Sequence, residues 1–371
     1  MRFISKGICG GTLILAAGGA AAQTSVTLYG VADTFVQYLD NGGTHSVSQR
    51  SGGSTGSLFG LKGTEDLGGG VRAAFDMEGG YNLNNGTLFA DTTALFYRQA
   101  WVGITSDKYG SLTAGRQYQP TFLLVYPADP FRTDEVLSPL VAQDLAIDKN
   151  TLSTQTISGR SSNSILYKSP NIGGLQLYGM YAFSASVTQP YPSTSGNMLD
   201  VAATYTNGSL YAGIGYQNRH SGVENFPTIP VALGTMGTQN FTAALSYHIG
   251  VVNLKATYIY SRPDTAPAHS TAALLGTAHS VSIAEVGATI QATAADAIAI
   301  AGVDRNVRGV HDNAPGFEVG IDHSISKRTS VYARVGYMKN NGTSAISWQG
   351  ITVTGTDQSQ TLAAVGITHR F

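Results

Sequence analysis

Residues 57–81 read SLFGLKGTEDLGGGVRAAFDMEGGY, and this stretch decides the fold. Two segments, 57–65 and 71–81, flank a glycine-rich connection. In the first segment Phe59 and Leu61 fall on one face and Lys62 falls on the other, which is the period of two expected of a strand. Glycine clusters between such segments mark tight turns. The stretch therefore predicts an antiparallel β-hairpin.

The hairpin pattern recurs along the whole chain. We count 16 such segments, an even number that suits a bacterial barrel with both termini on the periplasmic side. Short connections such as 170–174 alternate with long ones such as 184–197, as periplasmic turns and external loops do. Strands are expected at 24–38, 57–65, 71–81, 96–105, 110–118, 163–168, 175–183, 198–205, 209–217, 240–248 and 252–261, and from near 280, 295, 316, 330 and 360 onward.

The composition favours a membrane barrel. Charged residues make up 12% of the chain, whereas a soluble domain carries about 25%. No apolar run beyond residue 22 reaches the roughly 18 residues that a membrane helix needs. Only helices and closed barrels satisfy every backbone hydrogen bond in lipid. We therefore predict an all-β fold, a 16-stranded antiparallel transmembrane β-barrel over residues 23–371. With 20 Lys and Arg against 23 Asp and Glu, residues 23–371 carry a net charge of −3, which argues against nucleic acid as a partner.

Residues 1–22 predict a secretory signal peptide. Arg2 and Lys6 precede an apolar stretch that ends in three alanines, and cleavage is expected before Gln23. An N-terminal transmembrane helix is the alternative, but the apolar stretch is too short and too rich in Gly and Ala to cross a bilayer. Cys9 is the only cysteine. It leaves with the signal, so the mature chain has no disulfide and no thiol nucleophile.

The connection 119–162 differs from the others in length and composition. A structureless loop of this length in a compact fold is functional or disordered. We interpret it as a loop folded into the barrel lumen, where it narrows the channel. The alternative is a disordered external loop. Prolines and charges are concentrated in it: Pro120, Pro127, Pro130, Pro139, Asp129, Arg132, Asp134, Glu135, Asp144 and Asp148.

Several basic residues are expected to line the lumen opposite this loop. A charge cannot cheaply face lipid, so Lys62 is assigned to the inward face, and the same argument assigns Arg98 and Arg116. Arg160 stands at the end of the long loop. Inward basic residues that face a loop rich in carboxylates would create an electric field across the pore. Such a field would orient polar solutes and affect which ions pass. The alternative is that these charges are merely hydrated residues of a water-filled lumen.

The sequence carries no recognisable catalytic pattern. It has no Gly-x-Ser-x-Gly, no phosphate-binding glycine loop and no His-Glu-x-x-His. The eight histidines are scattered, and most stand in or beside loops. We therefore expect no catalytic residue, no metal site and no cofactor.

The chain resembles a known family, the Gram-negative general porins of the beta-proteobacterial type. The resemblance covers essentially the whole chain after the signal. The stretches that carry it are SVTLYGV at 25–31, FGLKGTEDLGGG at 59–70, RQAWVG at 98–103, GRQY at 115–118 and the terminal HRF at 369–371.

This resemblance implies a homotrimer of 16-stranded barrels in the outer membrane, in contact with lipid and lipopolysaccharide. Each barrel would pass small hydrophilic solutes and ions without chemistry, through a constriction formed by the third external loop. Arg98 and Arg160 match arginines that members place at the constriction. A terminal aromatic strand is the family's signal to the barrel-assembly machinery, a role that would fall to Phe371.

Two departures from the family pattern stand out. Leu58 replaces an arginine that commonly precedes Phe-Gly-Leu-Lys-Gly. The loop also lacks the Pro-Glu-Phe-Gly-Gly core of the enterobacterial branch, which leaves Asp129, Asp134 and Glu135 as candidates for the acidic side. Neither anion nor cation selectivity follows from the resemblance.

Passive diffusion through a porin is thus the favoured function, and two rivals remain. A substrate-specific outer-membrane channel would need an aromatic slide or a dense basic ladder along the lumen, and the pattern supplies neither. An outer-membrane barrel enzyme would need a Ser/His pair on the outer wall, whereas 16 strands and a long inward loop favour a lumen.

Overall fold

The computed structural model describes residues 25–144, 147–148, 153–154, 159–184, 196–224, 233–266, 268, 279–348 and 355–371. The predicted signal peptide lies outside the described residues. Nearly all regular structure in the described part is antiparallel sheet. Each wall strand pairs with the next one along the chain, and the last, β23, pairs with the first, β1, from Val31↔Arg370 to Asn41↔Gln360. The barrel is therefore closed.

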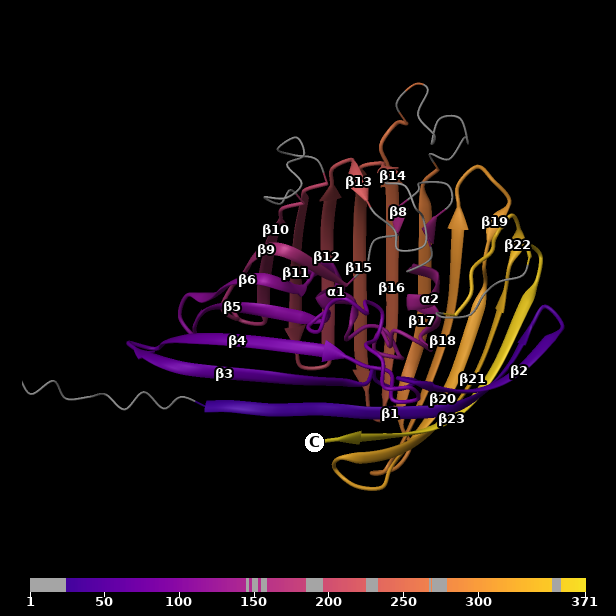
Figure 1. The fold of residues 1–371 in the computed structure, drawn as a ribbon, viewed down its shortest axis with the longest axis horizontal. Helices are drawn as coiled ribbons and strands as arrows, with labels where there is room; N and C mark the ends of the chain where they lie inside the picture. The colour runs from indigo at the N-terminus through magenta and orange to yellow at the C-terminus, as the bar shows by residue number, and fades with distance from the viewer. Residues whose placement is uncertain are drawn as a thin grey trace, which may run out of the picture.

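Sixteen antiparallel wall strands are present in the described part of the chain, β2 and β3 together forming one of them. The predicted fold class is confirmed. In Figure 1, β1 and β3–β6 cross the direction of β11–β16, as opposite walls of a barrel of tilted strands do. The wall consists of β1 (Ser25–Asn41), β2 (Thr44–Ser51), β3 (Leu58–Gly68), β4 (Val71–Gly80), β5 (Gln99–Ser106), β6 (Gly110–Tyr118), β9 (Arg160–Lys168), β10 (Leu175–Ala182), β11 (Met198–Asn207), β12 (Leu210–Arg219), β15 (Thr238–Ile249), β16 (Val252–Pro263), β17 (Val281–Gln291), β18 (Asp296–Val307), β20 (Gly316–Ser324), β21 (Thr329–Lys339) and β23 (Ser359–Arg370).

Three short hairpins or bridges complete the strands. They are β7 (Ile147–Asp148) with β8 (Ser153–Thr154), β13 (Gly222–Glu224) with β14 (Leu233–Thr235), and β19 (Asp312–Asn313) with β22 (Asn341–Gly342). The helices are α1 (Pro120–Val125) and α2 (Pro139–Asp144). Neither they nor any other helix among the residues described has the length and apolar character to cross a membrane.

The hairpin at 57–81 forms as the sequence predicts. Its register runs from Leu58↔Gly80 to Asp66↔Arg72, with an irregularity next to the turn. The three turn glycines, Gly68–Gly70, all have positive φ, between 62° and 84°. Only glycine adopts that conformation without strain, which explains the triple glycine.

β2, which together with β3 forms one wall strand, was not predicted. β1 extends to Asn41 and reverses directly into β2, which pairs with it from Thr34↔Ser51 to Asn41↔Thr44. β3 then takes over the pairing at Val31↔Leu58. The sequence of β2, THSVSQRS, is almost entirely polar, so it lacks the apolar alternation by which the other strands were found.

Alternating burial defines the two faces of the wall. In β1 the buried residues Phe35, Gln37 and Leu39 alternate with Val36 and Tyr38, which are 49% and 43% exposed. Exposed apolar residues recur on the outward face of most strands, which is the pattern of a lipid-facing wall. The inward face carries the buried polar residues.

Candidate functional site

A segment of the long connection packs on the inward face of the wall. We call residues 119–144 the L3 segment. Helix α1 contacts β11, β12 and β15, and α2 contacts β17, β18 and β20. Leu124 and Leu140 are fully buried in one apolar cluster with Ile259 and Ile283, which belong to the inward faces of β16 and β17. Figure 1 shows both helices within the outline of the strands.

Hydrogen bonds fix the start of the L3 segment to the wall. The carboxylate of Asp200 on β11 accepts bonds from the backbone nitrogen of Thr121 at 3.2 Å and from its hydroxyl at 2.7 Å. Gln217 on β12 donates to the same carboxylate at 2.9 Å. The Tyr211 hydroxyl donates to the carbonyl oxygen of Leu124 at 2.7 Å. These bonds use inward-facing residues of neighbouring strands.

The far side of the L3 segment packs against the opposite wall and the last connection. Val136 and Leu137 join an apolar cluster with Phe35 of β1 and Met338 of β21. The fully buried Trp348, from the connection between β21 and β23, donates its indole N–H to the carbonyl oxygen of Leu137 at 3.0 Å. The L3 segment is therefore attached on two sides.

Three of the predicted site residues come together in one buried cluster. Glu135 of the L3 segment lies 2.5 Å from Arg160 Nη2 and 3.3 Å from Arg98 Nη1, measured from its Oε1. Arg98 Nε also pairs with Glu78 of β4 at 2.6 Å. The Tyr97 hydroxyl donates to the other Glu135 oxygen at 2.7 Å. Burial alone would raise the pKa of Glu135, but the Arg160 and Arg98 charges outweigh it and lower the pKa to about 2.

The cluster also has an aromatic side. The guanidinium groups of Arg98 and Arg160 both donate to the Tyr118 hydroxyl, at 2.9 Å and 3.0 Å. The Arg160 guanidinium lies over the rings of Tyr97 and Tyr118, 5.3 Å and 4.6 Å from their centroids. Such contacts add cation–π attraction to the ion pairs.

This geometry differs from the arrangement we expected. The sequence suggested basic residues facing loop acids across an open gap. In the structure Arg98 and Arg160 each contact Glu135 directly, and each is 8% exposed. The reason is that the L3 segment returns to the base of its own connection, where Arg98 and Arg160 flank it. No feature of the linear sequence gives the distance between Glu135 and these two arginines.

Asp129 and Asp134 bond chiefly to the L3 segment itself. The Asp129 carboxylate accepts bonds from the backbone nitrogens of Phe131 and Thr133, both at 2.7 Å. The Asp134 carboxylate accepts from the backbone nitrogen of Leu137 at 2.8 Å. Burial raises the pKa of Asp134 to about 7. These two acids therefore shape turns, and both are buried.

Lys62 lies on the inward face, opposite Asp76 of β4. It is exposed, and its ammonium lies 5.0 Å from the centre of the Tyr29 ring. The Tyr29 hydroxyl in turn donates to Asp76 at 2.7 Å. Lys62 therefore lies on the inward face beside Asp76. The Tyr29 hydroxyl also donates to Glu78, the partner of Arg98, at 3.1 Å.

Arg116 does not take the inward orientation that we expected. It pairs with Ala100, on the face of β5 where Val102 and Ile104 are 61% and 54% exposed. Its guanidinium donates to the carbonyl oxygen of Tyr97 and, at 2.8 Å, to the Ser162 hydroxyl. The expectation failed because Arg116 stands near the end of a short strand, where its side chain reaches polar groups of the adjoining connections.

Further inward charges were missed by the sequence reading. Alternation would have found several of them: Glu318, for example, lies between Phe317 and Val319, which are 47% and 41% exposed. They include Asp33, Lys255, Glu285, Glu318, Asp322 and Arg334. Among the described residues no group of three or more His, Cys, Asp or Glu side chains could hold a metal.

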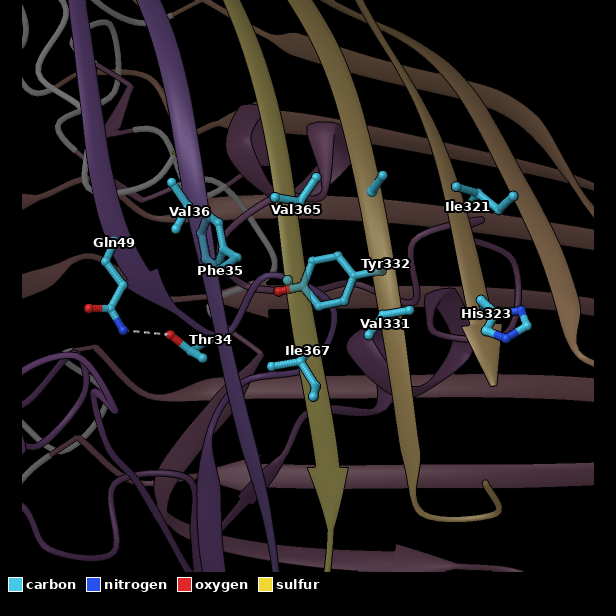
Figure 2. Close-up of a pocket in the computed structure, with 12 residues that line it drawn as sticks. Thr34, Phe35, Val36, Gln49, Ile321, His323, Val331, Tyr332, Val365 and Ile367 are labelled. Atoms are coloured by element: carbon cyan, nitrogen blue, oxygen red, sulfur yellow. Dashed lines mark hydrogen bonds between the residues drawn. The ribbon is translucent and has the colours of Figure 1, made fainter. Parts of the chain in front are cut away.

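An apolar hollow of about 630 Å³ lies on the other side of the wall (Figure 2). Val36, Val365 and Ile367 line it, and all three are outward-facing and more than two-fifths exposed. Figure 2 shows these side chains on neighbouring strands, with the Gln49 amide bonded to the Thr34 hydroxyl at one edge. The hollow belongs to the outer surface and has no part in an aqueous path.

Comparison with known proteins places this barrel in a family. A sequence model of the Gram-negative porin family matches residues 11–343. The chain belongs to the Gram-negative porin family. The resemblance read from the motif stretches is thereby confirmed.

Named relatives agree with this assignment. The porin is 29% identical to outer membrane porin protein 32 of Delftia acidovorans over 373 residues, covering 96% of this chain and 97% of the relative. It is 28% identical to an outer membrane porin protein of Bordetella pertussis, with 96% of each chain covered.

Solved structures share the fold. An anion-selective porin from Comamonas acidovorans superposes with a TM-score of 0.78 at 24% identity, over 94% of this chain and 100% of that one. The trimer form of OmpT from Vibrio cholerae gives a TM-score of 0.65 at 14% identity, over 94% and 99% of the two chains. This porin is a channel for passive diffusion in the outer membrane of a Gram-negative cell, and its family consists of channels rather than enzymes.

Proposed function

We propose that the L3 segment forms the constriction of the pore and that Glu135 is the residue that holds it in place. The supporting observation is the buried cluster in which Glu135 bridges Arg98 and Arg160. Buried ion pairs with full hydrogen bonding are sensitive to the loss of one partner. Small hydrophilic solutes and ions pass between the L3 segment and the uncovered part of the inner wall.

Arg98 and Arg160 act in this proposal as anchors. Their two positive charges are matched by the carboxylates of Glu78 and Glu135. A cluster that is balanced in charge adds little to the field in the lumen. The roles first expected for Asp129 and Asp134 become the shaping of the L3 turns, and Lys62 contributes a charge to the wet wall near Asp76.

We further propose that the chain assembles as a homotrimer in contact with lipid and lipopolysaccharide. The solved trimer form of OmpT supports the trimer. Phe371 is proposed as the signal read by the barrel-assembly machinery. Its backbone exchanges two hydrogen bonds with Gly30, and its ring remains 49% exposed.

The constriction is tested by replacing residues 129–138 with a Gly-Ser repeat of equal length. Liposomes that contain the wild-type or altered porin are exposed to neutral sugars of rising mass, and swelling rates are compared. We expect larger sugars to enter faster through the altered channel. Glu65→Gln, at an exposed position of β3 that pairs with Ala73 of β4, is the control. Equal size dependence in all three proteins would contradict a constriction made by the L3 segment.

A further inference from the structure

A polar cavity of about 360 Å³ lies inside the barrel beside the L3 segment. Its lining includes Val251, Ala295 and Ser324, which stand at or next to the short turns of the barrel. Short turns belong to the periplasmic side, so the cavity is at the periplasmic end of the lumen. Three arginines from separate elements reach it, namely Arg132 of the L3 segment, Arg334 of β21 and Arg370 of β23.

Arg132 is presented to the cavity by a strained turn. Arg132 and Thr133 have φ of 55° and 50°, a left-handed conformation that side-chain-bearing residues seldom adopt. Asp129 stabilises the turn by accepting the backbone N–H groups of Phe131 and Thr133. Arg132 is nevertheless exposed, while its neighbours on both sides are buried. Backbone strain of this kind is found at functional sites.

Arg132 and Arg370 differ from the other inward arginines in their charge environment. Arg334 pairs with Asp322, its Nη2 lying 2.9 Å from each carboxylate oxygen. In the described part of the chain, neither the Arg132 nor the Arg370 guanidinium forms an ion pair, and the Arg370 guanidinium donates to the Thr55 hydroxyl at 3.2 Å. The cavity therefore holds two guanidinium groups without a carboxylate partner.

Other charges near the cavity leave this excess in place. Lys255 donates to the backbone carbonyl of Asp129 at 2.9 Å, behind the turn that carries Arg132. The Lys255 ammonium and the Asp129 carboxylate offset one another. Glu285 and Glu318 are at most 1% exposed and do not line the cavity. Glu318 Oε1 lies 3.8 Å from Arg334 Nε.

We propose that this cavity is a binding subsite for small dianions, specifically those with two or more oxyanion oxygens such as phosphate or a short dicarboxylate. Two unpaired guanidinium forks match two negative charges, and each fork can bond two oxygens at once. Ser54, Ser330 and Asn253 add hydroxyl and amide groups to the lining. The Asp322 carboxylate also lines the cavity and is paired with Arg334. A monoanion would leave one guanidinium without a partner. This subsite rests on the proposed function, because it lies on the diffusion path.

The test is a single-channel recording in potassium chloride at constant ionic strength, with potassium phosphate or succinate added on the periplasmic side. Saturable reduction of the chloride current is expected with both dianions, and acetate should give none. Arg132→Asn removes the charge with a residue that tolerates the left-handed conformation. It should raise the half-blocking concentration about tenfold, as the loss of a charged hydrogen bond does. Arg370→Gln should do the same, and Arg132→Lys should give an intermediate value.

Arg328→Gln is the matched control, since Arg328 is an exposed residue of a short turn outside the cavity lining. Its half-blocking concentration should equal that of the wild type. A current reduction that never saturates, or that is the same in Arg132→Asn as in the wild type, would overturn the subsite while leaving the channel intact. The proposed constriction fails by a separate result, equal size dependence in the liposome-swelling test, which leaves the saturable block by dianions unaffected.

Discussion

Replacing Glu135 by Gln tests how the L3 segment is held. The substitution keeps the size of the side chain but removes the charge that bridges Arg98 and Arg160. The pKa of Glu135 falls from an ordinary 4.5 to about 2 in the folded protein. At about 1.4 kcal/mol for each pKa unit, the cluster stabilises the charged form by about 3 kcal/mol. Removal of one partner from a buried ion pair costs about 3–5 kcal/mol, which agrees.

A loss of about 3 kcal/mol raises the population of detached L3 segments about 100-fold. We expect single-channel recordings of Glu135→Gln to show frequent excursions from the main conductance level, where the wild type is steady. The Glu65→Gln control should behave as the wild type. Indistinguishable dwell-time distributions in Glu135→Gln and the wild type would refute the anchoring role.

The pH dependence of the same recordings has a defined sign. The folded-state pKa of Glu135 is lowered, so its contribution is complete above pH 4.5 and is lost as the pH falls towards 2. At pH 3 about 2 kcal/mol of it is gone. Burial raises the pKa of Asp134 from 3.8 to about 7, so attachment weakens as the pH rises through that range. The steadiest channel is therefore expected near pH 4–5, and monotonic behaviour from pH 3 to pH 8 would contradict these assignments.

Two further substitutions and one deletion address other contacts. Asp200→Ala removes the acceptor of the two Thr121 hydrogen bonds and should weaken attachment of the start of the L3 segment by about 2 kcal/mol. Proteolysis within residues 119–144 should become faster. Unchanged proteolysis would show that these bonds are redundant. Trp348→Ala leaves a cavity at a fully buried site beside Leu137 and should cost about 3–5 kcal/mol of local stability. Hydrogen exchange at residues 136–138 measures this loss. Unchanged protection there would show that the contact does not hold the L3 segment. Deletion of Phe371 should lower the yield of assembled porin in cells; a normal yield would remove its proposed signalling role.

Much of the fold could be predicted because a barrel strand has a strict period of two. Outward side chains face lipid and inward side chains are polar, so each strand can be recognised from its own sequence. In β20, for example, Phe317 and Val319 flank Glu318. The exception, β2, shows the limit of this reasoning. Its polar residues pair with β1 near the end of the barrel, where no apolar outward face is required, so the alternation is absent.

The candidate site was less predictable, because alternation gives the direction of a side chain but not what covers it. Lys62 is an inward charge of β3 and is exposed, whereas Arg98, which precedes β5 and has the parity of its exposed Val102, is buried under Glu135. The difference lies in where the L3 segment rests, and that depends on contacts between residues far apart in the chain, such as Thr121 with Asp200.

The same contacts determine which charges a solute meets. When the L3 segment docks, its Glu135 pairs with Arg160 and with Arg98, which is also paired with Glu78 of the wall, and Arg132 is carried to the periplasmic cavity. Detachment would reverse both effects: two arginines would be uncovered at the wall and one would leave the cavity. Glu135→Gln should therefore alter ion preference as well as steadiness, whereas Arg132→Asn should alter dianion block alone. A variant pair that changed both properties together would show that the anchor and the cavity are one site.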